Sequence, residues 1–279
     1  MGVDLLVSVA ELANLGQRPD VRLVDVRWKL GDPSAGHAMF LAGHIPGAVY
    51  LDMDEDLASA PGLGGRHPLP AAEQFAASMA RVGIDNDSWV IAYDDGGSGA
   101  ARLWWLLRHF GHTRVSILDG GYPAWLAAGG VPETGKGAPV SITEFHVSTT
   151  KGDCVDEDEL KERLDEGQVH LVDARAPERW RGEVEPVDTV PGRIPGSINA
   201  PTSDALRNGF FRSAEELRDY YMALGVVDGK PIVVSCGSGV SACVNLVAME
   251  LAGIRGAQLY PGSFSGWIAH RLPVETGPG

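Results

Sequence analysis

Short apolar runs alternate with helix-like segments along the whole chain of 279 residues. Runs of a few apolar residues, bounded by polar residues or glycine, are typical of buried strands. They occur at residues 23–26, 90–93, 115–118, 169–172, 231–235 and 257–260. Residues 100–110 and about 239–251 are long and apolar enough for buried helices. The alternation predicts an α/β fold in which each domain has a mainly parallel sheet flanked by helices.

The two halves of the sequence carry four matching landmarks in the same order. Leu23–Arg27 returns as Leu171–Arg175, His44–Val49 as Arg193–Ile198, Val90–Asp95 as Ile232–Gly237, and Leu118–Gly121 as Leu259–Gly262. The offsets lie between 141 and 149 residues, a regularity that chance does not explain. The sequence therefore predicts tandem domains at 1–128 and 153–279. A linker at 129–152, rich in glycine, proline, serine and threonine, joins them.

The charge balance limits the partners of this chain. Its formal net charge is -14, whereas nucleic acid and anionic membrane surfaces are bound through clustered Lys and Arg. No apolar stretch approaches the roughly eighteen residues of a membrane span. Three cysteines are too few, and odd in number, for a disulfide framework, which favours a cytoplasmic location.

Cys236 ends an apolar run and opens a glycine-containing loop that leads into an apolar helix. In open α/β sheets, ligands bind beyond the carboxyl ends of the strands. The glycines allow backbone N–H groups and the helix dipole to point at one anion, and a thiol there is stabilised as the nucleophilic thiolate. The binding positions predicted around it are Gly237, Gly239, Val240 and Ser241, and Ser238 adds a hydroxyl. The alternative is a buried structural cysteine before an ordinary turn.

Three motifs carry a resemblance to a known family. Residues 236–242 resemble the active-site loop of 3-mercaptopyruvate sulfurtransferases, with Ser241 where threonine is usual. Residues 40–48 match the first rhodanese signature, and 260–264 resemble the C-terminal one, although Gly266 stands where that pattern has glutamate. The sequence therefore resembles the two-domain rhodanese family over essentially its whole length. The resemblance implies a catalytic second domain and an inactive first domain, in which Asp94 occupies the position of Cys236.

The resemblance also implies roles for residues outside the loop. Arg179 matches a family arginine that holds the anionic end of the sulfur donor, because a guanidinium suits a carboxylate or thiosulfate; a surface ion pair is the alternative. The mercaptopyruvate branch has a second arginine about nine positions later, where this sequence has Asp188. That departure leaves the identity of the donor open.

His44 matches a histidine that is proposed, in the mercaptopyruvate branch, to form a relay with the loop serine, here Ser238. Asp32 is the carboxylate partner that the spacing favours. The alternative is that His44 only caps the turn before Pro46. Of the other cysteines, Cys243 is expected to be a small buried side chain, rather than a thiol that resolves the persulfide.

The resemblance implies a double-displacement reaction. The Cys236 thiolate takes the outer sulfur of the donor, pyruvate or sulfite leaves, and a thiol (small or on a thioredoxin-like protein) or cyanide removes the sulfur. Thiosulfate-specific members carry basic residues just after the cysteine, whereas this loop is neutral, so 3-mercaptopyruvate is the preferred donor and thiosulfate the alternative. No cofactor or metal is predicted, since the eight histidines are scattered.

Two other functions compete with sulfur transfer as explanations of this cysteine loop. A Cys-based phosphatase needs an arginine six positions after the cysteine to grip the phosphate, and Ala242 stands there. A non-catalytic binding or sensor module is the remaining alternative. The intact cysteine loop argues against it.

Overall fold

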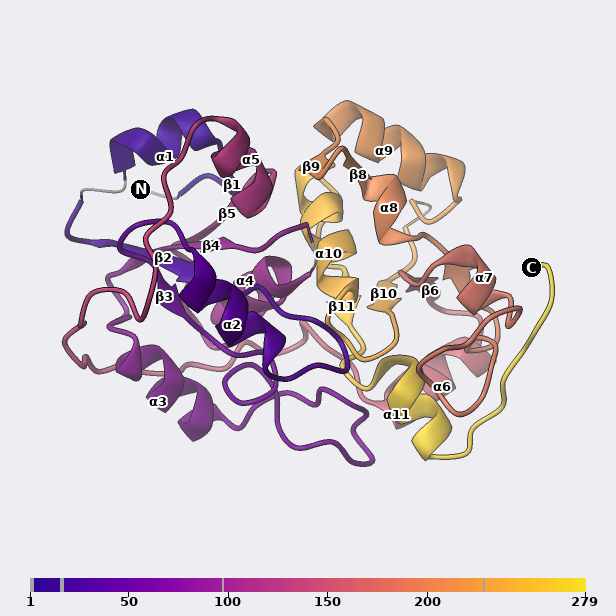
Figure 1. Ribbon diagram of the computed structural model, residues 1–279. Coiled ribbons are helices and arrows are strands. Elements are labelled where there is room, and N and C mark those ends of the chain that lie inside the picture. The colour runs from indigo at the N-terminus through magenta and orange to yellow at the C-terminus, as the bar shows by residue number, and fades with distance from the viewer. Residues whose placement is uncertain (1–2, 16–17, 97, 228) are drawn as a thin grey trace. The chain divides into compact units, whose positions relative to one another are not determined.

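The computed structural model describes residues 3–15, 18–96, 98–227 and 229–279, and it divides into two compact units (Figure 1). The first unit contains the described residues of Met1–Ser59, Leu69–Thr150 and Asn208–Phe210. The second contains those of Ala60–Pro68, Lys151–Arg207 and Phe211–Gly279. The division at Thr150 assigns nearly all of the predicted linker to the first unit. Ala60–Pro68, from the first half of the sequence, belongs to the second unit, which the repeat did not reveal.

The first unit is built on a five-stranded sheet in the order β1-β5-β4-β2-β3, in which all neighbours are parallel. Its strands are β1 (Leu6–Val7), β2 (Val21–Asp25), β3 (Val49–Tyr50), β4 (Trp89–Tyr93) and β5 (Val115–Leu118). Its helices are α1 (Val9–Leu15), α2 (Ala35–Ala42), α3 (Ala72–Arg81), α4 (Gly99–His109) and α5 (Gly121–Ala127). The central strand β4 is buried from Val90 to Tyr93, as expected of a parallel strand covered on both faces.

The second unit contains a four-stranded parallel sheet in the order β11-β10-β6-β7. Its strands are β6 (His170–Asp173), β7 (Ile198–Asn199), β10 (Ile232–Ser235) and β11 (Gln258–Leu259). Its helices are α6 (Glu157–Asp165), α7 (Pro177–Trp180), α8 (Thr202–Ala205), α9 (Ala214–Ala223), α10 (Ala242–Leu251) and α11 (Ser263–Ala269). Between α8 and α9 the chain forms two short paired strands, β8 (Leu206–Arg207) and β9 (Phe210–Phe211).

Helix α10 is buried along nearly its whole length, because residues 242–249 are almost entirely apolar and contain neither glycine nor proline. It begins at Ala242 rather than near Gly239, where the sequence placed its start. Gly239 has φ +75°, a left-handed conformation that cannot belong to the helix. The loop after Cys236 is therefore longer than the sequence suggested.

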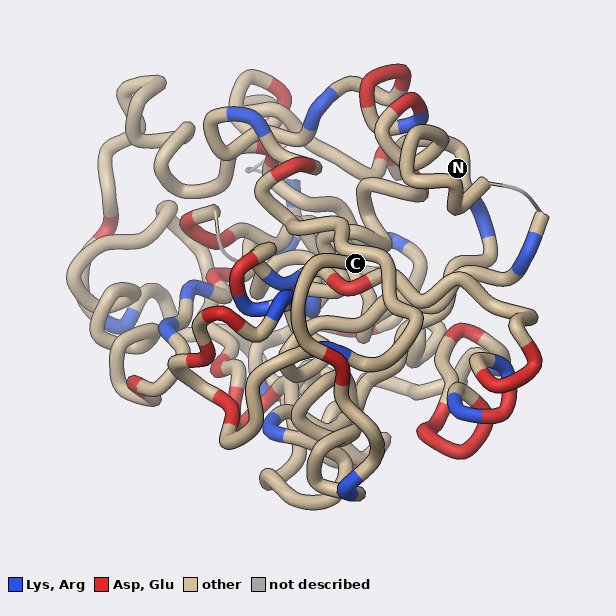
Figure 2. Tube along the Cα trace, turned by 90° about the vertical axis from the view of Figure 1, so that its right-hand side faces the viewer, with Lys and Arg blue, Asp and Glu red and all other residues tan. Residues whose placement is uncertain are grey.

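The predicted α/β fold, with parallel sheets flanked by helices, is confirmed in both units. Acidic and basic positions are scattered along the described trace, and the basic positions form no long run there (Figure 2). Within the described part of the chain, no helix combines the length and the apolar character needed to cross a membrane.

Candidate active site

Strand β10 delivers Cys236 to the carboxyl edge of the second sheet. The strand pairs with β6 on one side and with β11 on the other, so it is central and its end is fixed. Cys236 follows directly and is only 1% exposed. The loop of residues 237–241 then leads into α10, whose N-terminus carries the positive end of the helix dipole. This is the place where ligands bind in open α/β sheets.

The loop aims a backbone donor at the sulfur. The N–H of Gly239 donates to Sγ of Cys236 at 3.1 Å. A side chain at position 239 would be strained by its positive φ, and its Cβ would lie 2.5 Å from the carbonyl oxygen of Pro261. Only glycine allows this approach. A hydrogen-bond donor aimed at Sγ suits a sulfur that carries negative charge.

The start of α11 holds the backbone of the loop from the other side. The N–H groups of Phe264 and Ser265 donate to the carbonyls of Cys236 and Gly237 at 3.0 and 2.9 Å. The hydroxyl of Ser263 accepts the N–H of Cys236 at 3.0 Å and lies 3.0 Å from the carbonyl of Tyr260. Ser263 has φ +49°, an uncommon conformation for a serine that brings its hydroxyl to the cysteine.

The remaining predicted loop residues lie between the cysteine and α10. Val240 is buried, and its carbonyl accepts the N–H of Cys243 at 3.1 Å. Ser241 stands at the N-cap of α10, where its side chain makes no capping hydrogen bond. Ser238 is 6% exposed and faces a histidine instead of the helix.

That histidine is His67. Its Nδ1 lies 2.7 Å from Oγ of Ser238, and the ring is only 4% exposed. Imidazole and hydroxyl are therefore paired out of water beside the cysteine loop. The pair can accept or donate a proton there.

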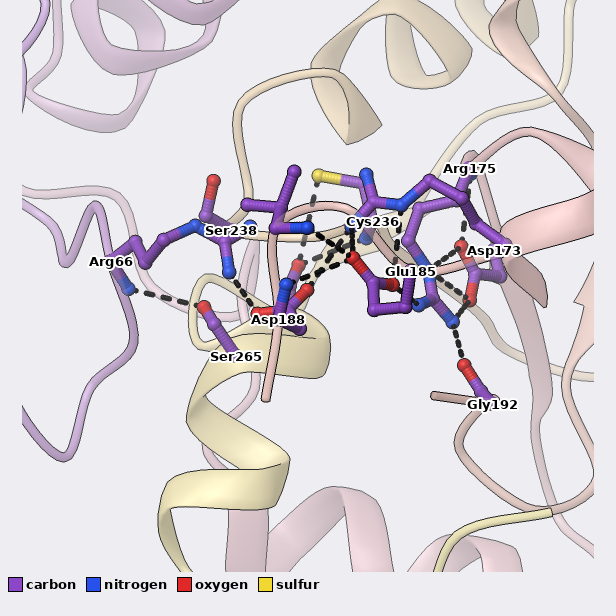
Figure 3. Close-up of polar contacts among 12 residues, drawn as sticks. Arg66, Asp173, Arg175, Glu185, Asp188, Gly192, Cys236, Ser238 and Ser265 are labelled. Carbon is purple, nitrogen blue, oxygen red and sulfur yellow. Dashed lines mark hydrogen bonds and ion pairs between the residues drawn. The ribbon is translucent and has the colours of Figure 1, made fainter. Parts of the chain in front are cut away.

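His67 belongs to the segment Ala60–Pro68, which packs in the second unit. Gly62 and Gly65 exchange two backbone hydrogen bonds of 3.0 Å, which makes a tight turn. A Cβ on Gly65 would lie 2.7 Å from the carbonyl oxygen of Gly262, so only glycine fits against α11. The N–H of Arg66 donates to Oγ of Ser265 at 3.1 Å, which ties the segment to the helix that supports the loop (Figure 3).

Two guanidinium groups border Gly237. Nη2 of Arg66 lies 2.7 Å from the point where a Cβ of residue 237 would stand, and both terminal nitrogens of Arg179 lie 3.9 Å from it. The absence of a side chain at position 237 makes room for these groups. The structure thus places Arg179 beside the loop, where the sequence predicted a donor contact, and adds Arg66.

Both arginines are paired with buried carboxylates. Arg179 donates to Glu185 at 2.7 and 3.2 Å and to Asp188 at 3.2 Å. Arg66 contacts Asp188 (Figure 3). Burial raises the pKa of the Asp188 carboxyl. For Glu185, burial is outweighed by hydrogen bonds from Arg179 and from backbone N–H groups, so its pKa is lowered.

His44 and Asp32, the two other members of the predicted relay, both make contacts within the first unit. His44 is buried in the first unit, where its Nδ1 lies 2.8 Å from the carbonyl oxygen of Phe40. Its ring also stacks on the ring of Phe40, with 3.9 Å between the ring centroids. Asp32 is exposed in the same unit and accepts hydrogen bonds from the N–H and hydroxyl of Ser34. Within the second unit, the histidine that contacts the Ser238 hydroxyl is His67. The motif that contains His44 matches a family signature, and in the first unit it forms a turn closed by the N–H of Ala48 and the carbonyl of Ile45 at 2.9 Å.

None of the three cysteines forms a disulfide. Cys243 is fully buried, as expected, and its thiol lies 3.4 Å from the carbonyl of Gly239. Cys154 is half-buried, and burial, together with the negative charge of Asp153, raises its pKa to about 11.

Sequence reasoning missed Arg66, His67 and Glu185. The first two follow a glycine-rich turn that has no counterpart among the repeated landmarks. An unrepeated segment with adjacent arginine and histidine is the signal that marks them. Glu185 lies in an acidic stretch that resembles a solvated surface, and only the fold shows that it is buried.

Comparison with known proteins identifies the family. A family model described as the rhodanese-like domain matches the chain twice, over residues 8–128 and 156–270. The chain belongs to the rhodanese family. The resemblance that the three motifs carried is confirmed, and both halves of the repeat are rhodanese-like domains.

Relatives that match nearly the whole chain indicate which class of reaction it catalyses. One from Mycobacterium tuberculosis, provisionally named thiosulfate sulfurtransferase SseB, is 43% identical over 98% of this chain and 97% of its own length. One from Pseudomonas aeruginosa, provisionally named 3-mercaptopyruvate sulfurtransferase, is 42% identical over 98% of each chain. The crystal structure of SseA from Escherichia coli, a 3-mercaptopyruvate enzyme of rhodanese fold, has a TM-score of 0.84 at 33% identity. It covers 94% of this chain and 100% of its own. These relatives place the chain among the sulfurtransferases, while their names divide between two donors.

Proposed function

We propose that this sulfurtransferase takes the outer sulfur of 3-mercaptopyruvate onto Cys236 as a persulfide and passes it to a thiol or to cyanide. Thiosulfate is the alternative donor. The observation that carries the proposal is the hydrogen bond from the N–H of Gly239 to Sγ of Cys236, at 3.1 Å. Two guanidinium groups border the same loop.

In the first half-reaction, the Cys236 thiolate attacks the sulfur of 3-mercaptopyruvate. A sulfur–sulfur bond forms and the carbon–sulfur bond breaks, with its electron pair remaining on the three-carbon fragment. That fragment takes up one proton and leaves as pyruvate. With thiosulfate, the bond between its two sulfurs breaks instead, and sulfite leaves with the electron pair. The cysteine is a covalent nucleophile in both cases.

The donor's anionic end is held by Arg179 and Arg66. Both guanidiniums lie beside Gly237, next to the nucleophile, and such forks bind a carboxylate in two-point fashion. The residues of the loop itself are neutral. A singly charged carboxylate held from outside the loop therefore fits this site better than a dianion that needs cations at the sulfur.

Ser238 and His67 are proposed to serve proton transfer. Their 2.7 Å contact pairs a hydroxyl with an imidazole beside the reacting sulfur, both shielded from water. The fragment released from 3-mercaptopyruvate needs a proton, whereas sulfite does not. The pair should therefore matter more for the carboxylate donor.

In the second half-reaction, an acceptor thiolate attacks the outer sulfur of the persulfide, and the Cys236 thiolate is released. A small thiol, a thioredoxin-like protein or cyanide would serve as acceptor. We place the reaction in the cytoplasm, and the three unbridged cysteines support this, because reducing compartments keep thiols free.

Steady-state kinetics with both donors, measured side by side, test the proposal. We expect turnover with each and a higher kcat/KM for 3-mercaptopyruvate. Mass spectrometry after donor treatment should show one added sulfur on the peptide that contains Cys236. A protein that turns over neither donor, or carries the added sulfur on Cys154 or Cys243, contradicts the proposal.

Arg179→Ala tests the anion contact. It should raise KM for 3-mercaptopyruvate by roughly tenfold or more and lower kcat less, because the carboxylate is held equally before and during sulfur transfer. Arg181→Ala is the matched control: Arg181 lies two positions away, is partly exposed and pairs with Glu183. An equal rise in KM for both variants would show that general surface charge, not a contact, is responsible.

A further inference from the structure

An alternating series of charged side chains runs through the second unit to the Cys236 loop. In order of contact it comprises Asp173, Arg175, Glu185, Arg179, Asp188 and Arg66. Figure 3 shows Asp188 and Glu185 between Arg66 and Arg175. Three carboxylates face three guanidiniums, so the series is electrically balanced.

Asp188 is the carboxylate shared by the two arginines at the loop. Its Oδ1 contacts Nη1 of Arg66, and its Oδ2 lies 3.2 Å from Nη2 of Arg179. The side chain is only 3% exposed. A charge shielded from water and salt acts on its neighbours far more strongly than a surface charge does.

The arginines keep donor groups for a ligand. Nε of Arg66 is buried and has no hydrogen-bond partner among the described residues. Nη2 of the same side chain approaches Gly237 most closely, and the guanidinium of Arg179 lies near the same point. An anion bound beside Gly237 therefore meets two positive groups and, directly behind them, the negative charge of Asp188.

We propose that Asp188 is a specificity-determining residue of the donor site, an inference that rests on the function proposed above. Its negative charge lowers the positive potential that the two guanidiniums create beside Gly237, and this penalises an anion with two negative charges more than an anion with one. A 2-oxo carboxylate such as 3-mercaptopyruvate carries one negative charge, whereas thiosulfate carries two. The carboxylate thus selects against the dianion while holding both arginines in place.

Asp188→Asn tests this role, because asparagine has the same size and keeps one oxygen that accepts from an arginine. The interaction energy gained by removing one negative charge scales with the charge of the donor. We expect kcat/KM to rise about tenfold for 3-mercaptopyruvate and about a hundredfold for thiosulfate, which shifts their ratio about tenfold. Asp188→Glu keeps the charge and should keep the wild-type ratio.

Glu183→Gln is the matched control, since it removes the same charge from the same stretch of chain. Glu183 is 55% exposed and pairs with Arg181 instead of the arginines at the loop. Its variant should leave the donor ratio within about twofold. An unchanged ratio in a folded Asp188→Asn, or an equal shift in Glu183→Gln, overturns the proposal.

The wild-type protein offers a second readout through pH. The charged groups that face Asp188 are Arg66 from the segment 60–68, Arg179 from α7, and Glu185. The pKa of Asp188 is raised and that of Glu185 is lowered, so acidification neutralises Asp188 first. The thiosulfate-to-mercaptopyruvate ratio should therefore rise as the pH falls in the wild type and stay flat in Asp188→Asn. The same pH dependence in both proteins would contradict the assignment.

Binding without turnover separates this inference from the proposed function. In a Cys236→Ser background, calorimetry measures the affinity of thiosulfate and of pyruvate with and without Asp188→Asn. The substitution should strengthen thiosulfate binding about tenfold more than pyruvate binding. If the wild-type protein turns over neither donor, the proposed function is wrong. If Asp188→Asn raises the affinity for thiosulfate and for pyruvate equally, the proposed role of Asp188 is wrong.

Discussion

The loop after β4 in the first unit and the loop after β10 in the second are held in the same way. The carbonyl of Asp94 accepts a hydrogen bond from the N–H of Tyr122 at 2.7 Å, as the carbonyl of Cys236 does from Phe264 at 3.0 Å. Each loop leads directly into a buried helix, α4 or α10. The two loops therefore share these backbone contacts, and the side chains at their starts differ.

The support beneath the two loops is also duplicated. In each unit a buried arginine pairs with the aspartate two positions before it, donates to a glycine carbonyl and lies 4.0 Å from the centre of an aromatic ring. The sets are Arg27, Asp25, Gly43 and Tyr122 in the first unit, and Arg175, Asp173, Gly192 and Phe264 in the second. These pairs fix the edge of each sheet and belong to the architecture of the domain.

The side chain at the end of the strand decides what the loop does. In the first unit, the N–H groups of Gly96 and Ala100 donate to the Asp94 carboxylate at 2.9 and 3.0 Å. The Asp94 carboxyl group therefore occupies the backbone N–H groups of its own loop. Burial raises the pKa of this carboxyl group. In the second unit, the sulfur of Cys236 accepts the N–H of Gly239 and remains able to form a new bond. Backbone N–H groups point at the side chain that follows the strand in both copies, and only the second copy has a thiol there.

Cys236→Ser is the substitution with the largest expected effect. Turnover with either donor should fall by about three orders of magnitude or more, because a hydroxyl cannot carry the sulfur. Cys154→Ser is the matched control and should retain most of the activity. Kinetics with both donors measure the difference. If Cys236→Ser keeps more than a few per cent of wild-type turnover, Cys236 is not the nucleophile.

The second prediction concerns the reactivity of Cys154, a thiol outside the Cys236 loop. Because the pKa of Cys154 is raised to about 11, its thiol stays protonated near neutral pH and only its small thiolate fraction reacts. In Cys236→Ser, alkylation of Cys154 at pH 8 should be about a hundredfold slower in the folded protein than in urea, where an ordinary pKa near 8.5 applies. Mass spectrometry of the labelled peptide follows the rate. A folded-state rate that levels off near pH 8.5 would show an unshifted thiol.

The fold and the place of Cys236 at the end of a buried strand were predictable because their signals are local. Buried parallel strands produce continuous apolar runs, and the repeat gave every landmark twice, so that Asp94 could be matched to Cys236. Helix α10 was misplaced only at its start, since a left-handed glycine such as Gly239 leaves no trace in an apolar pattern.

The partners of the cysteine were not predictable, because they come from distant segments. His67 and Arg66 lie far from the loop in sequence and reach it through a glycine turn that packs on α11. The sequence shows only that Asp188 stands where the mercaptopyruvate branch has its second arginine. That a carboxylate there would be buried between two guanidiniums depends on the path of the chain after α7, which no periodicity encodes.

The two histidines provide the third prediction. His67→Ala should lower kcat for 3-mercaptopyruvate about 10- to 100-fold, because Ser238 loses its partner for proton transfer, and should lower kcat for thiosulfate less. His44→Ala should leave kcat within about twofold, while the loss of a buried, stacked ring costs about 2 kcal/mol of folding free energy. Kinetics and thermal unfolding of both variants distinguish the roles. A loss of activity in His44→Ala without a loss of stability would restore the relay that the sequence suggested.

Asp94→Cys has the smallest expected effect and tests the comparison between the loops most directly. The new thiol would stand at the position that matches Cys236, at the end of a strand and before a buried helix. Its surroundings still differ, because Asp95 follows it where Gly237 follows Cys236, and Gly31 stands at the position that matches Arg179. A negative neighbour repels an anionic donor, and no matching guanidinium holds it.

We expect total turnover within about twofold of wild type and about a hundredfold less added sulfur on residue 94 than on Cys236. Mass spectrometry of the two peptides after brief donor treatment measures this, with Asp94→Cys combined with Asp95→Gly as the partial rescue. Equal loading of the two thiols in the single variant would mean that the loop alone suffices, and that the charged residues around Cys236 set donor preference without being needed for sulfur transfer.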